Sequence, residues 1–235
     1  MVRQKDELFA RALEKTRRGD WSGVQWIIAH RAKTAHKGAV GLYATNEAAG
    51  FVNERALDAL KGQAFERYAE FYGEATEDDF NGDVIFKCKE GARVISLVNA
   101  KDGWSYQNGS VGTVTKIDRG NEEITVDFDR TGEAVIAPNV WSIKDYEVRG
   151  GKLLERERGS IKQMPLKLAY ALTIHKSQGQ TFSRVNLDPY CFDDGHLYVA
   201  LSRCQSVDGL YFTAPPKREY LMSSQQVRAF YEGSQ

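Results

Sequence analysis

The sequence has few cysteines, and their spacing fits neither a metal site nor a disulfide framework. Cys88, Cys191 and Cys204 are odd in number and far apart, with no CxxC pair and no Cys/His cluster. A zinc-binding module needs closely spaced ligands, and a small secreted scaffold needs an even set of cysteines. The pattern therefore favours a reduced intracellular protein without a structural metal.

The sequence also lacks long apolar runs and an excess of either charge. No run approaches the roughly 20 apolar residues that a helix needs to cross a bilayer. The first residues, MVRQKDELFARALEKTRRGDW, resemble a charged amphipathic helix rather than a signal peptide. Lys plus Arg equals Asp plus Glu, 32 against 32, so any nucleic-acid binding must come from local patches. We expect a soluble, cytoplasmic protein with no membrane partner.

The first sixty residues alternate between helical and strand patterns. One helix is predicted up to Gly19 and a second around Trp21 to Arg31. The apolar run AVGLYAT predicts a strand that is covered on both faces. The helix expected after it, which stops at Gly62, has an apolar face formed by Ala48, Phe51, Val52, Ala56, Ala59 and Leu60. Strand followed directly by helix is the unit of an α/β domain.

The middle of the chain has a different pattern. Residues 66–83 are acidic and irregular, which predicts a solvated connector. Residues 83–162 contain five or six short strand-like runs separated by turns such as Asn108-Gly109 and Thr131-Gly132. Such a series indicates a small barrel of the SH3 or OB type, and the spacing fits both.

The α/β pattern then returns. PLKLAY, SRVNLDP and GLYFTA are strand candidates, TIHKSQG predicts a short helix closed by Gly179, and DDGHLYVALSRC predicts a helix capped by Asp193 or Asp194. The fold predicted is therefore α/β, with a parallel-sheet domain formed by residues 1–88 and 163–235. A small β-barrel, residues 89–162, interrupts it.

One stretch has an unusual charge pattern. From Arg158 to Leu187 there is no Asp or Glu, whereas five residues are basic: Arg158, Lys162, Lys167, Lys176 and Arg184. A local positive field of this kind suits a nucleic-acid backbone or a nucleotide phosphate. By composition alone, an ordinary basic surface explains the stretch as well.

A second stretch, LYVALSRCQ, places Leu197, Ala200, Leu201 and Cys204 on one helical face. Arg203 follows at the helix end, where it is expected to project from the body of the domain. An arginine there is either a solvated or carbonyl-capping group, or a residue that reaches a γ-phosphate across a cleft as an arginine finger does.

These stretches resemble a known family. LAYALTIHKSQGQTFSRV followed by LYVALSRCQSVDGLYF resembles motifs V and VI of superfamily 1B DNA helicases of the RecD/Pif type. VGLYATNEAAGFVNERAL is similar to their motif IV, EGARVISLVNA with QNGSVGTV to the start of their SH3-like domain 2B, and ALEKTRRGDWSG to the segment after motif III. The resemblance covers nearly the whole chain and implies a RecA-like domain 2A carrying an SH3-like domain 2B.

The resemblance also implies an activity and its cofactors. The family moves 5′→3′ along single-stranded DNA with ATP and Mg²⁺, and works at single-strand/double-strand junctions in replication, repair and recombination. Its phosphate-binding GxxxxGK[ST] loop does not occur in these 235 residues. We therefore expect an N-terminal RecA-like domain as partner, which provides most of the contacts to ATP and Mg²⁺. We expect no ATPase activity from this chain alone.

Roles for single residues follow from the resemblance. Arg203 would be the arginine finger, and Gln178 and Gly179 would line the same ATP cleft. No residue of the chain is expected to bind a metal. The residues that would contact single-stranded DNA are Thr45, Asn46, Asn108, Thr173, His175 and Lys176.

Less specific roles explain several of these residues equally well. His175 could be a packed or helix-capping histidine, and Thr45 with Asn46 could be a simple turn and N-cap. Near Asn108, Trp104 and Tyr106 could stack on bases or support the core. Two other functions stay open: a stand-alone nucleic-acid-binding module without ATPase activity, and an adaptor that keeps only the fold.

Overall fold

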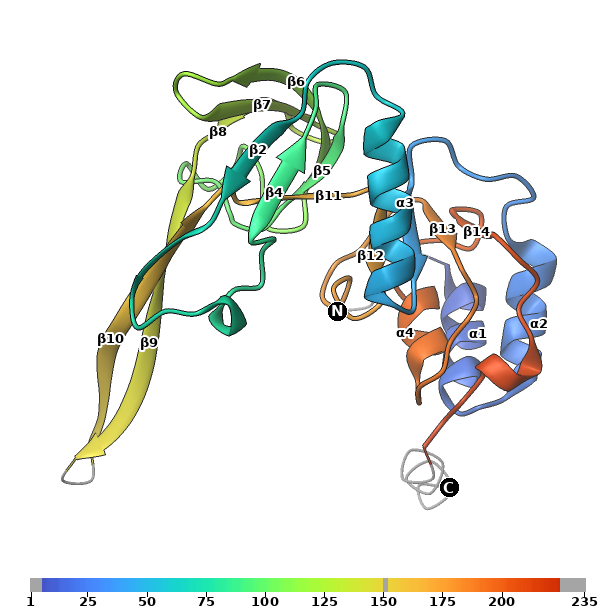
Figure 1. The fold of residues 1–235 in the computed structure, drawn as a ribbon. Coiled ribbons are helices and arrows are strands. Elements are labelled where there is room, and N and C mark those ends of the chain that lie inside the picture. The colour runs from blue at the N-terminus through green and yellow to red at the C-terminus, as the bar shows by residue number, and fades with distance from the viewer. Residues whose placement is uncertain (1–5, 150–151, 225–235) are drawn as a thin grey trace. The chain divides into compact units, whose positions relative to one another are not determined.

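The computed structural model describes residues 6–149 and 152–224, and the chain folds into two compact units (Figure 1). One comprises Met1–Glu54 with Tyr170–Gln235, and the other comprises Arg55–Ala169. The predicted boundaries, after residues 88 and 162, enclose a shorter segment than the observed second unit, which begins at Arg55 and ends at Ala169. No helix in the described ranges is long and apolar enough to cross a membrane.

The first unit is built on a four-stranded parallel sheet of order β12-β1-β13-β14. The strands are β1 Val40–Tyr43, β12 Ala171–Thr173, β13 Val185–Leu187 and β14 Leu210–Phe212. β1 pairs with β12 on one side and with β13 on the other. Its Val40 and Leu42 are buried, as the apolar run predicted for a strand covered on both faces.

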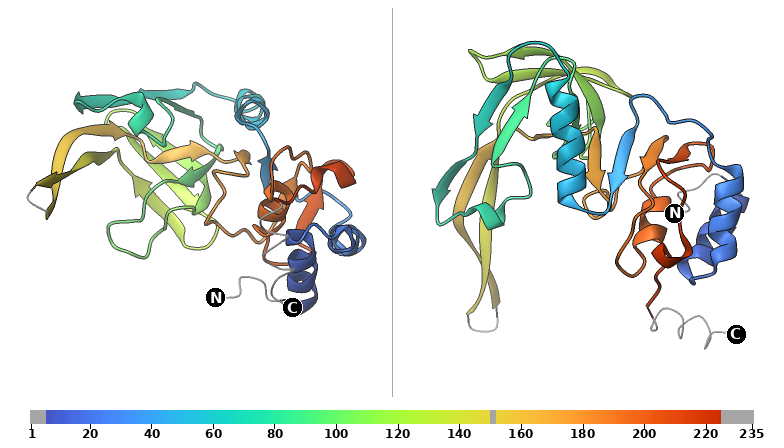
Figure 2. Two further views of the ribbon diagram at one scale, coloured as in Figure 1. Left: turned by 90° about the horizontal axis from the view of Figure 1, so that it is seen from below. Right: turned by 45° about the vertical axis from the view of Figure 1, so that its right-hand side comes forward.

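Helices cover both faces of this sheet. They are α1 Glu7–Arg17, α2 Trp21–His30, α3 Asn46–Asp58 and α4 His196–Leu201. Figure 2 shows α3 on one side of the strands and α1, α2 and α4 on the other. The side chains of Asp6 and Asp20 cap α1 and α2 by accepting main-chain N–H bonds. The predicted parallel sheet of an α/β domain is therefore confirmed.

The buried face of α3 differs from the predicted one. Ala49 and Leu57 are buried, whereas Phe51 is 64% exposed. Between them lies Asn53, whose amide donates to the main-chain oxygen of Ala171 over 2.8 Å and accepts from its N–H over 2.9 Å. Because these two bonds satisfy the backbone at the start of β12, the polar Asn53 rather than the largest apolar residues fixes which stripe of α3 faces the sheet.

The second unit contains a five-stranded antiparallel sheet of order β11-β5-β6-β7-β8. The strands are β5 Arg93–Ser96, β6 Val111–Asp118, β7 Glu123–Phe128, β8 Gly132–Ile136 and β11 Leu166–Leu168. In the part of the chain that is described, the two edge strands β11 and β8 do not pair with each other, so the sheet is open and no closed barrel is found. β11, predicted as a strand of the α/β domain, pairs instead with β5.

The core of the second unit explains where it begins. Phe65 of β2 (Phe65–Tyr68) and Phe86 of β4 (Ile85–Cys88) pack in one cluster with the side chains of the five-stranded sheet. Leu57, near the end of α3, belongs to the same cluster. The chain therefore enters the β-rich unit at α3, well before residue 89.

A long two-stranded ribbon, β9 Asn139–Arg149 with β10 Lys152–Gln163, extends from this unit (Figure 1). β3 (Glu70–Gly73) pairs with β10, and a short helix η1 (Glu77–Asp79) follows β3 in the chain. The connector predicted at residues 66–83 is thus largely structured. Acidic composition was misleading because its carboxylates pair with basic side chains of β10, as in Glu70–Lys162 and Asp79–Arg158.

Candidate functional site

The turn after β12 carries most of the residues predicted for function. The main-chain N–H of Ser177 bonds to the oxygen of Thr173 over 3.0 Å, and those of Gln178 and Gln180 bond to the oxygens of His175 and Ser177. The segment is thus a series of tight turns, not the predicted helix, because bonds spanning four residues do not continue past Ser177. Gly179 has φ +82°, the left-handed conformation that glycine adopts without strain.

Arg203 lies directly beside this turn. Its guanidinium donates to the main-chain oxygens of Ser177 and Gln180, each over 3.3 Å, and to the hydroxyl of Ser202 over 3.0 Å. Its Nε donates to the oxygen of Val199 over 3.0 Å. The side chain is buried, 8% exposed, and not projecting as predicted. These acceptors are neutral, and they hold the guanidinium at the corner formed by Gln178 and Gly179.

α4, which carries Arg203 past its end, starts in an unpredicted way. Its N-cap is Gly195 with φ 72°, whereas Asp193 or Asp194 was expected. The main-chain oxygen of Asp193 accepts from the N–H of His196 over 3.2 Å. The predicted buried face of the helix is correct, because Leu197, Ala200, Leu201 and Cys204 are all buried.

The corner places one buried guanidinium beside exposed residues. Gln178 and Gly179 are exposed beside the Arg203 guanidinium. The side-chain oxygen of Gln180 is buried and has no hydrogen-bond partner among the described residues. In the same residues, no group of three or more His, Cys, Asp or Glu side chains could hold a metal ion. A guanidinium beside exposed main chain can contact an anionic group such as a phosphate.

Five of the residues predicted to contact DNA lie on one edge of the parallel sheet. β1 and β12 are neighbours, with Tyr43 opposite Thr173, so the residues that follow both strands emerge together. The N–H of Ile174 bonds to the oxygen of Tyr43 over 2.9 Å, which ties the two segments. Thr45 and Asn46 therefore share this edge with the turn that contains His175 and Lys176.

The side chains at this edge differ in accessibility. Thr173 is buried, and its hydroxyl accepts from the N–H of Lys176 over 3.2 Å. Thr45 is half-buried and caps α3 through the N–H of Ala48, also over 3.2 Å. Asn46, His175 and Lys176 are exposed. Two of the residues predicted to contact DNA thus use their hydroxyls to shape the backbone, and three present side chains to solvent.

Asn108 belongs to the other unit, in the loop between β5 and β6. Its main-chain N–H bonds to the side chain of Asn99 over 2.8 Å, and its side chain is exposed. Nearby, Tyr106 stacks on the core residue Phe128 with ring centroids 5.0 Å apart, whereas Trp104 is 72% exposed. Of the two aromatic residues in this loop, Tyr106 supports the core and Trp104 does not.

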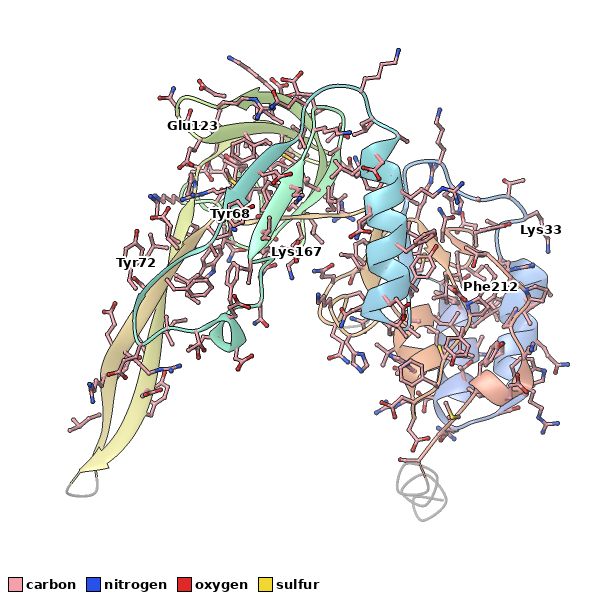
Figure 3. All side chains as sticks on the ribbon, viewed as in Figure 1. Lys33, Tyr68, Tyr72, Glu123, Lys167 and Phe212 are labelled. Atoms are coloured by element: carbon pink, nitrogen blue, oxygen red, sulfur yellow. The ribbon has the colours of Figure 1, made fainter. Side chains whose placement is uncertain are left out.

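The basic stretch is not a continuous positive surface. Arg158 pairs with Asp79 and Asp145, Lys162 with Glu70, and Lys167 with Asp83. Lys167, labelled in Figure 3, is also buried and donates to the main-chain oxygen of Asn81. Carboxylates distant in the sequence therefore neutralise the part of the stretch in the β-rich unit. Lys176 and Arg184, in the first unit, are exposed, and among the described residues no ion pair involves either of them.

His196, which no sequence pattern singles out, contacts the turn. Its ring centroid lies 4.6 Å from that of His175, and it is only 3% exposed. Burial lowers the pKa of His196, and the nearby His175 lowers it further, while Asp193 opposes the shift. The imidazole is therefore held neutral. A histidine within a helical pattern gives no signal of this contact, because His175 comes from a segment that is distant in the sequence.

The three cysteines take no part in the site. All are buried, and burial raises the pKa of Cys88 and Cys191 to about 12 and that of Cys204 to about 11. A thiol that stays protonated is a poor nucleophile. Cys204 therefore acts as a packing residue on α4, as expected.

No protein-family model matches the chain. Among curated proteins, it is 32% identical over 220 residues to the ATP-dependent DNA helicase PIF1 of Homo sapiens, covering 88% of the chain and 33% of that protein. It is 38% identical over 124 residues to the ATP-dependent DNA helicase PIF1 of Xenopus laevis, covering 52% of the chain and 18% of that protein. The chain thus matches a third or less of the length of these relatives.

Solved structures agree with the sequence comparison. Unliganded Pif1 from Bacteroides sp aligns with 98% of the chain at a TM-score of 0.85 and 26% identity, covering 55% of its own chain. A structure of Bacteroides Pif1 bound to ssDNA aligns with 99% of the chain at a TM-score of 0.71, covering 54% of its own chain. Sequence and fold thus point to the same proteins.

Proposed function

We propose that the chain forms one side of the ATP-binding cleft of a DNA helicase, because it is a homologue of Pif1-type superfamily 1B DNA helicases and corresponds to their C-terminal half. The other side of the cleft is an N-terminal RecA-like domain that provides most of the contacts to ATP and Mg²⁺. In this proposal the parallel-sheet unit is domain 2A and the β-rich unit is the SH3-like domain 2B. The complete enzyme moves 5′→3′ on single-stranded DNA.

The observation that carries the proposal is the position of Arg203. Its guanidinium is bonded to the oxygens of Ser177 and Gln180, on both sides of the Gln178–Gly179 corner. The charge is thus placed beside exposed backbone, without the entropy cost of ordering a free arginine. When ATP binds to the partner domain, Arg203 exchanges its carbonyl acceptors for the γ-phosphate. It then stabilises the negative charge that develops in the transition state.

The DNA contacts follow from the carboxyl edge of β1 and β12. His175, Lys176 and Asn46 are the exposed side chains there, and Thr45 and Thr173 hold the backbone that presents them. Because only Ser177 separates Lys176 from the Gln178–Gly179 corner, a change of nucleotide at Arg203 moves the segment that contacts DNA. Asn108, in the β-rich unit, is a further proposed contact. A Bacteroides Pif1 has been solved bound to ssDNA, which supports single-stranded DNA as the ligand.

The central test is the substitution of Arg203 in the complete helicase. Arg203→Ala should lower the DNA-stimulated ATPase rate by about 10³- to 10⁵-fold, the usual contribution of an arginine finger. Arg203→Lys keeps the charge but not the fork of donors, so it should restore only a small part of the rate. The matched control is Arg11→Ala, an exposed arginine on α1 of the same unit. Unchanged turnover in Arg203→Ala, with the fold intact, would contradict the proposal.

The isolated chain provides a second, independent test. We expect it to bind single-stranded DNA but to hydrolyse no ATP, because it contains no GxxxxGK[ST] loop. Hydrolysis by the purified 235-residue chain would refute the division of labour proposed here. A stand-alone binding module, the alternative function, would bind DNA equally well whether or not an N-terminal RecA-like domain and ATP were added.

A further inference from the structure

Five rings of the first unit form a connected series beside the turn that follows β12. We call Tyr220, Tyr190, Phe192, His196 and His175 the ring row. Ring centroids are 5.7 Å apart for Tyr220 and Tyr190, 6.0 Å for Tyr190 and Phe192, 5.4 Å for Phe192 and His196, and 4.6 Å for His196 and His175. The rings come from the turn, from the segment between β13 and α4, from α4 and from the short helix η2 (Arg218–Tyr220).

The middle of the ring row is open to solvent. Tyr190 is 49% exposed and Phe192 is 51% exposed. Phe192 and His196 meet at 83°, and Tyr190 and Tyr220 at 80°, so these neighbours contact edge to face. Rings in this arrangement leave faces that their neighbours do not cover. Two large rings kept half in water are a surface for a planar ligand rather than part of a core.

His196 is an independent sign of a ligand. Although it is 3% exposed, neither of its ring nitrogens has a hydrogen-bond partner among the described residues. An unpaired buried polar atom is costly, so a structure that keeps one is expected to use it. The two rings that contact it, His175 and Phe192, are both exposed. A small movement of either ring would bring a ligand on the row within reach of an imidazole nitrogen.

The charges around the ring row indicate what kind of ligand it is. The ammonium of Lys217 lies 5.7 Å from the ring centre of Tyr220 and is paired with the carboxylate of Glu219 over 3.4 Å, whereas the exposed Lys176 follows His175 at the other end. Between them are acids: the carboxylates of Asp188 and Asp193 accept the N–H groups of Tyr190 and Asp194. Carboxylates repel phosphates, so phosphates fit the end at Lys176 and an uncharged planar group fits the middle.

We propose that the ring row is a stacking surface for unpaired bases of the DNA strand whose phosphates are held at the turn containing His175 and Lys176. This inference rests on the proposed function, since it takes single-stranded DNA as the ligand. Every base has a π-face, so rings arranged along a strand bind bases without reading their sequence. Tyr190 and Phe192 are the stacking residues.

The test compares two oligonucleotides of equal length and charge, oligothymidylate and an abasic strand of the same number of phosphates. Binding to the 235-residue chain is measured by fluorescence anisotropy. The double variant Tyr190→Ala/Phe192→Ala should bind oligothymidylate about 5- to 140-fold more weakly, the effect of losing one stacked base. Its affinity for the abasic strand should stay within about twofold, because the phosphate contacts remain.

Two controls separate stacking from loss of structure. Tyr190→Phe/Phe192→Tyr keeps both rings and should keep the affinity for oligothymidylate. Phe51→Ala removes an exposed ring of the same unit outside the ring row and should change nothing. As a direct readout, 5-iodouracil in the strand should photocrosslink to the peptide that contains Tyr190 and Phe192.

Each contrary result has a distinct meaning. If the unchanged chain binds neither strand, the proposed function fails, and the stacking surface fails with it. If the unchanged chain binds both strands and the double alanine variant binds oligothymidylate as tightly, only the stacking surface is refuted. That result is also expected if the ring row docks a protein. Equal losses for the abasic strand and for oligothymidylate would likewise refute it.

Discussion

The guanidinium of Arg203 and the main-chain oxygen of Gln180 are joined by a hydrogen bond of 3.3 Å. The bond links the end of α4 to a turn more than twenty residues earlier in the chain, and Gly179 is the residue that lets the turn close. A change of backbone at Gly179 therefore moves an acceptor of the proposed arginine finger. This relationship allows local strain to be separated from a specific effect on the site.

Gly179→Ala should lower the free energy of unfolding by roughly 1 kcal/mol, because an L-residue is strained at positive φ. Gly38 is a matched control, since it has φ +74° against +82° for Gly179, and an added Cβ would meet nothing within 4 Å at either position. Urea unfolding should show similar losses for both alanine variants. Only Gly179→Ala should also lower the ATPase rate of the complete helicase. Equal rates for both variants would argue against a role of the corner in catalysis.

The salt dependence of DNA binding should identify which basic residues contact phosphates. Lys176→Ala and Arg184→Ala should each reduce the slope of log affinity against log salt by about 0.7, the value for one phosphate on a single strand. Lys162→Ala is the control, because Lys162 is paired with Glu70 over 3.6 Å. Titrations of the 235-residue chain at several salt concentrations provide the slopes. If Lys162→Ala changed this slope as much as Lys176→Ala does, the whole basic stretch would contact phosphates, as the sequence suggested.

Acid should destabilise the first unit through His196. Burial lowers the pKa of His196 below its usual 6.5, so the unfolded chain binds the proton more readily than the folded one. Its contribution to stability is intact above pH 6.5 and is lost as the pH falls through the folded pKa. His196→Gln removes this titration and should flatten the fall in urea midpoint between pH 7 and pH 5. His30→Gln, at an exposed histidine at the end of α2, is the control. An unchanged slope in His196→Gln would refute the assignment.

The sequence predicts the parallel sheet well because its strands are short apolar runs next to turns. β1, β13 and β14 all lie where such runs predicted them. The family resemblance also placed Arg203 and the Gln178–Gly179 corner together, and the structure has them in contact through Ser177 and Gln180. The bond from Arg203 to Val199, one helical turn earlier, is the carbonyl-capping role that the sequence left open. Local pattern could not give the acceptors of Ser177 and Gln180, because they belong to another segment.

The errors share a physical cause, which is that polar groups decide the structure through distant partners. Asn53 orients α3 by bonding to Ala171, so the apolar face counted from the sequence was wrong. Gln163, buried at 0% exposure, donates to the main-chain oxygens of Arg67, Asp83 and Val84 and thereby organises a segment that was predicted as a connector. Neither amide differs in the sequence from a solvated one.

The paired bonds between Asn53 and Ala171 have a consequence for how the chain could change over time. They join the point where the chain leaves the parallel-sheet unit to the point where it returns. Both ends of the intervening segment, Arg55–Ala169, are therefore held by bonds within that unit. The entropy cost of closing an excursion rises only with the logarithm of its length. Inserted segments of very different lengths could therefore replace one another between Asn53 and Ala171 while the parallel sheet keeps its register.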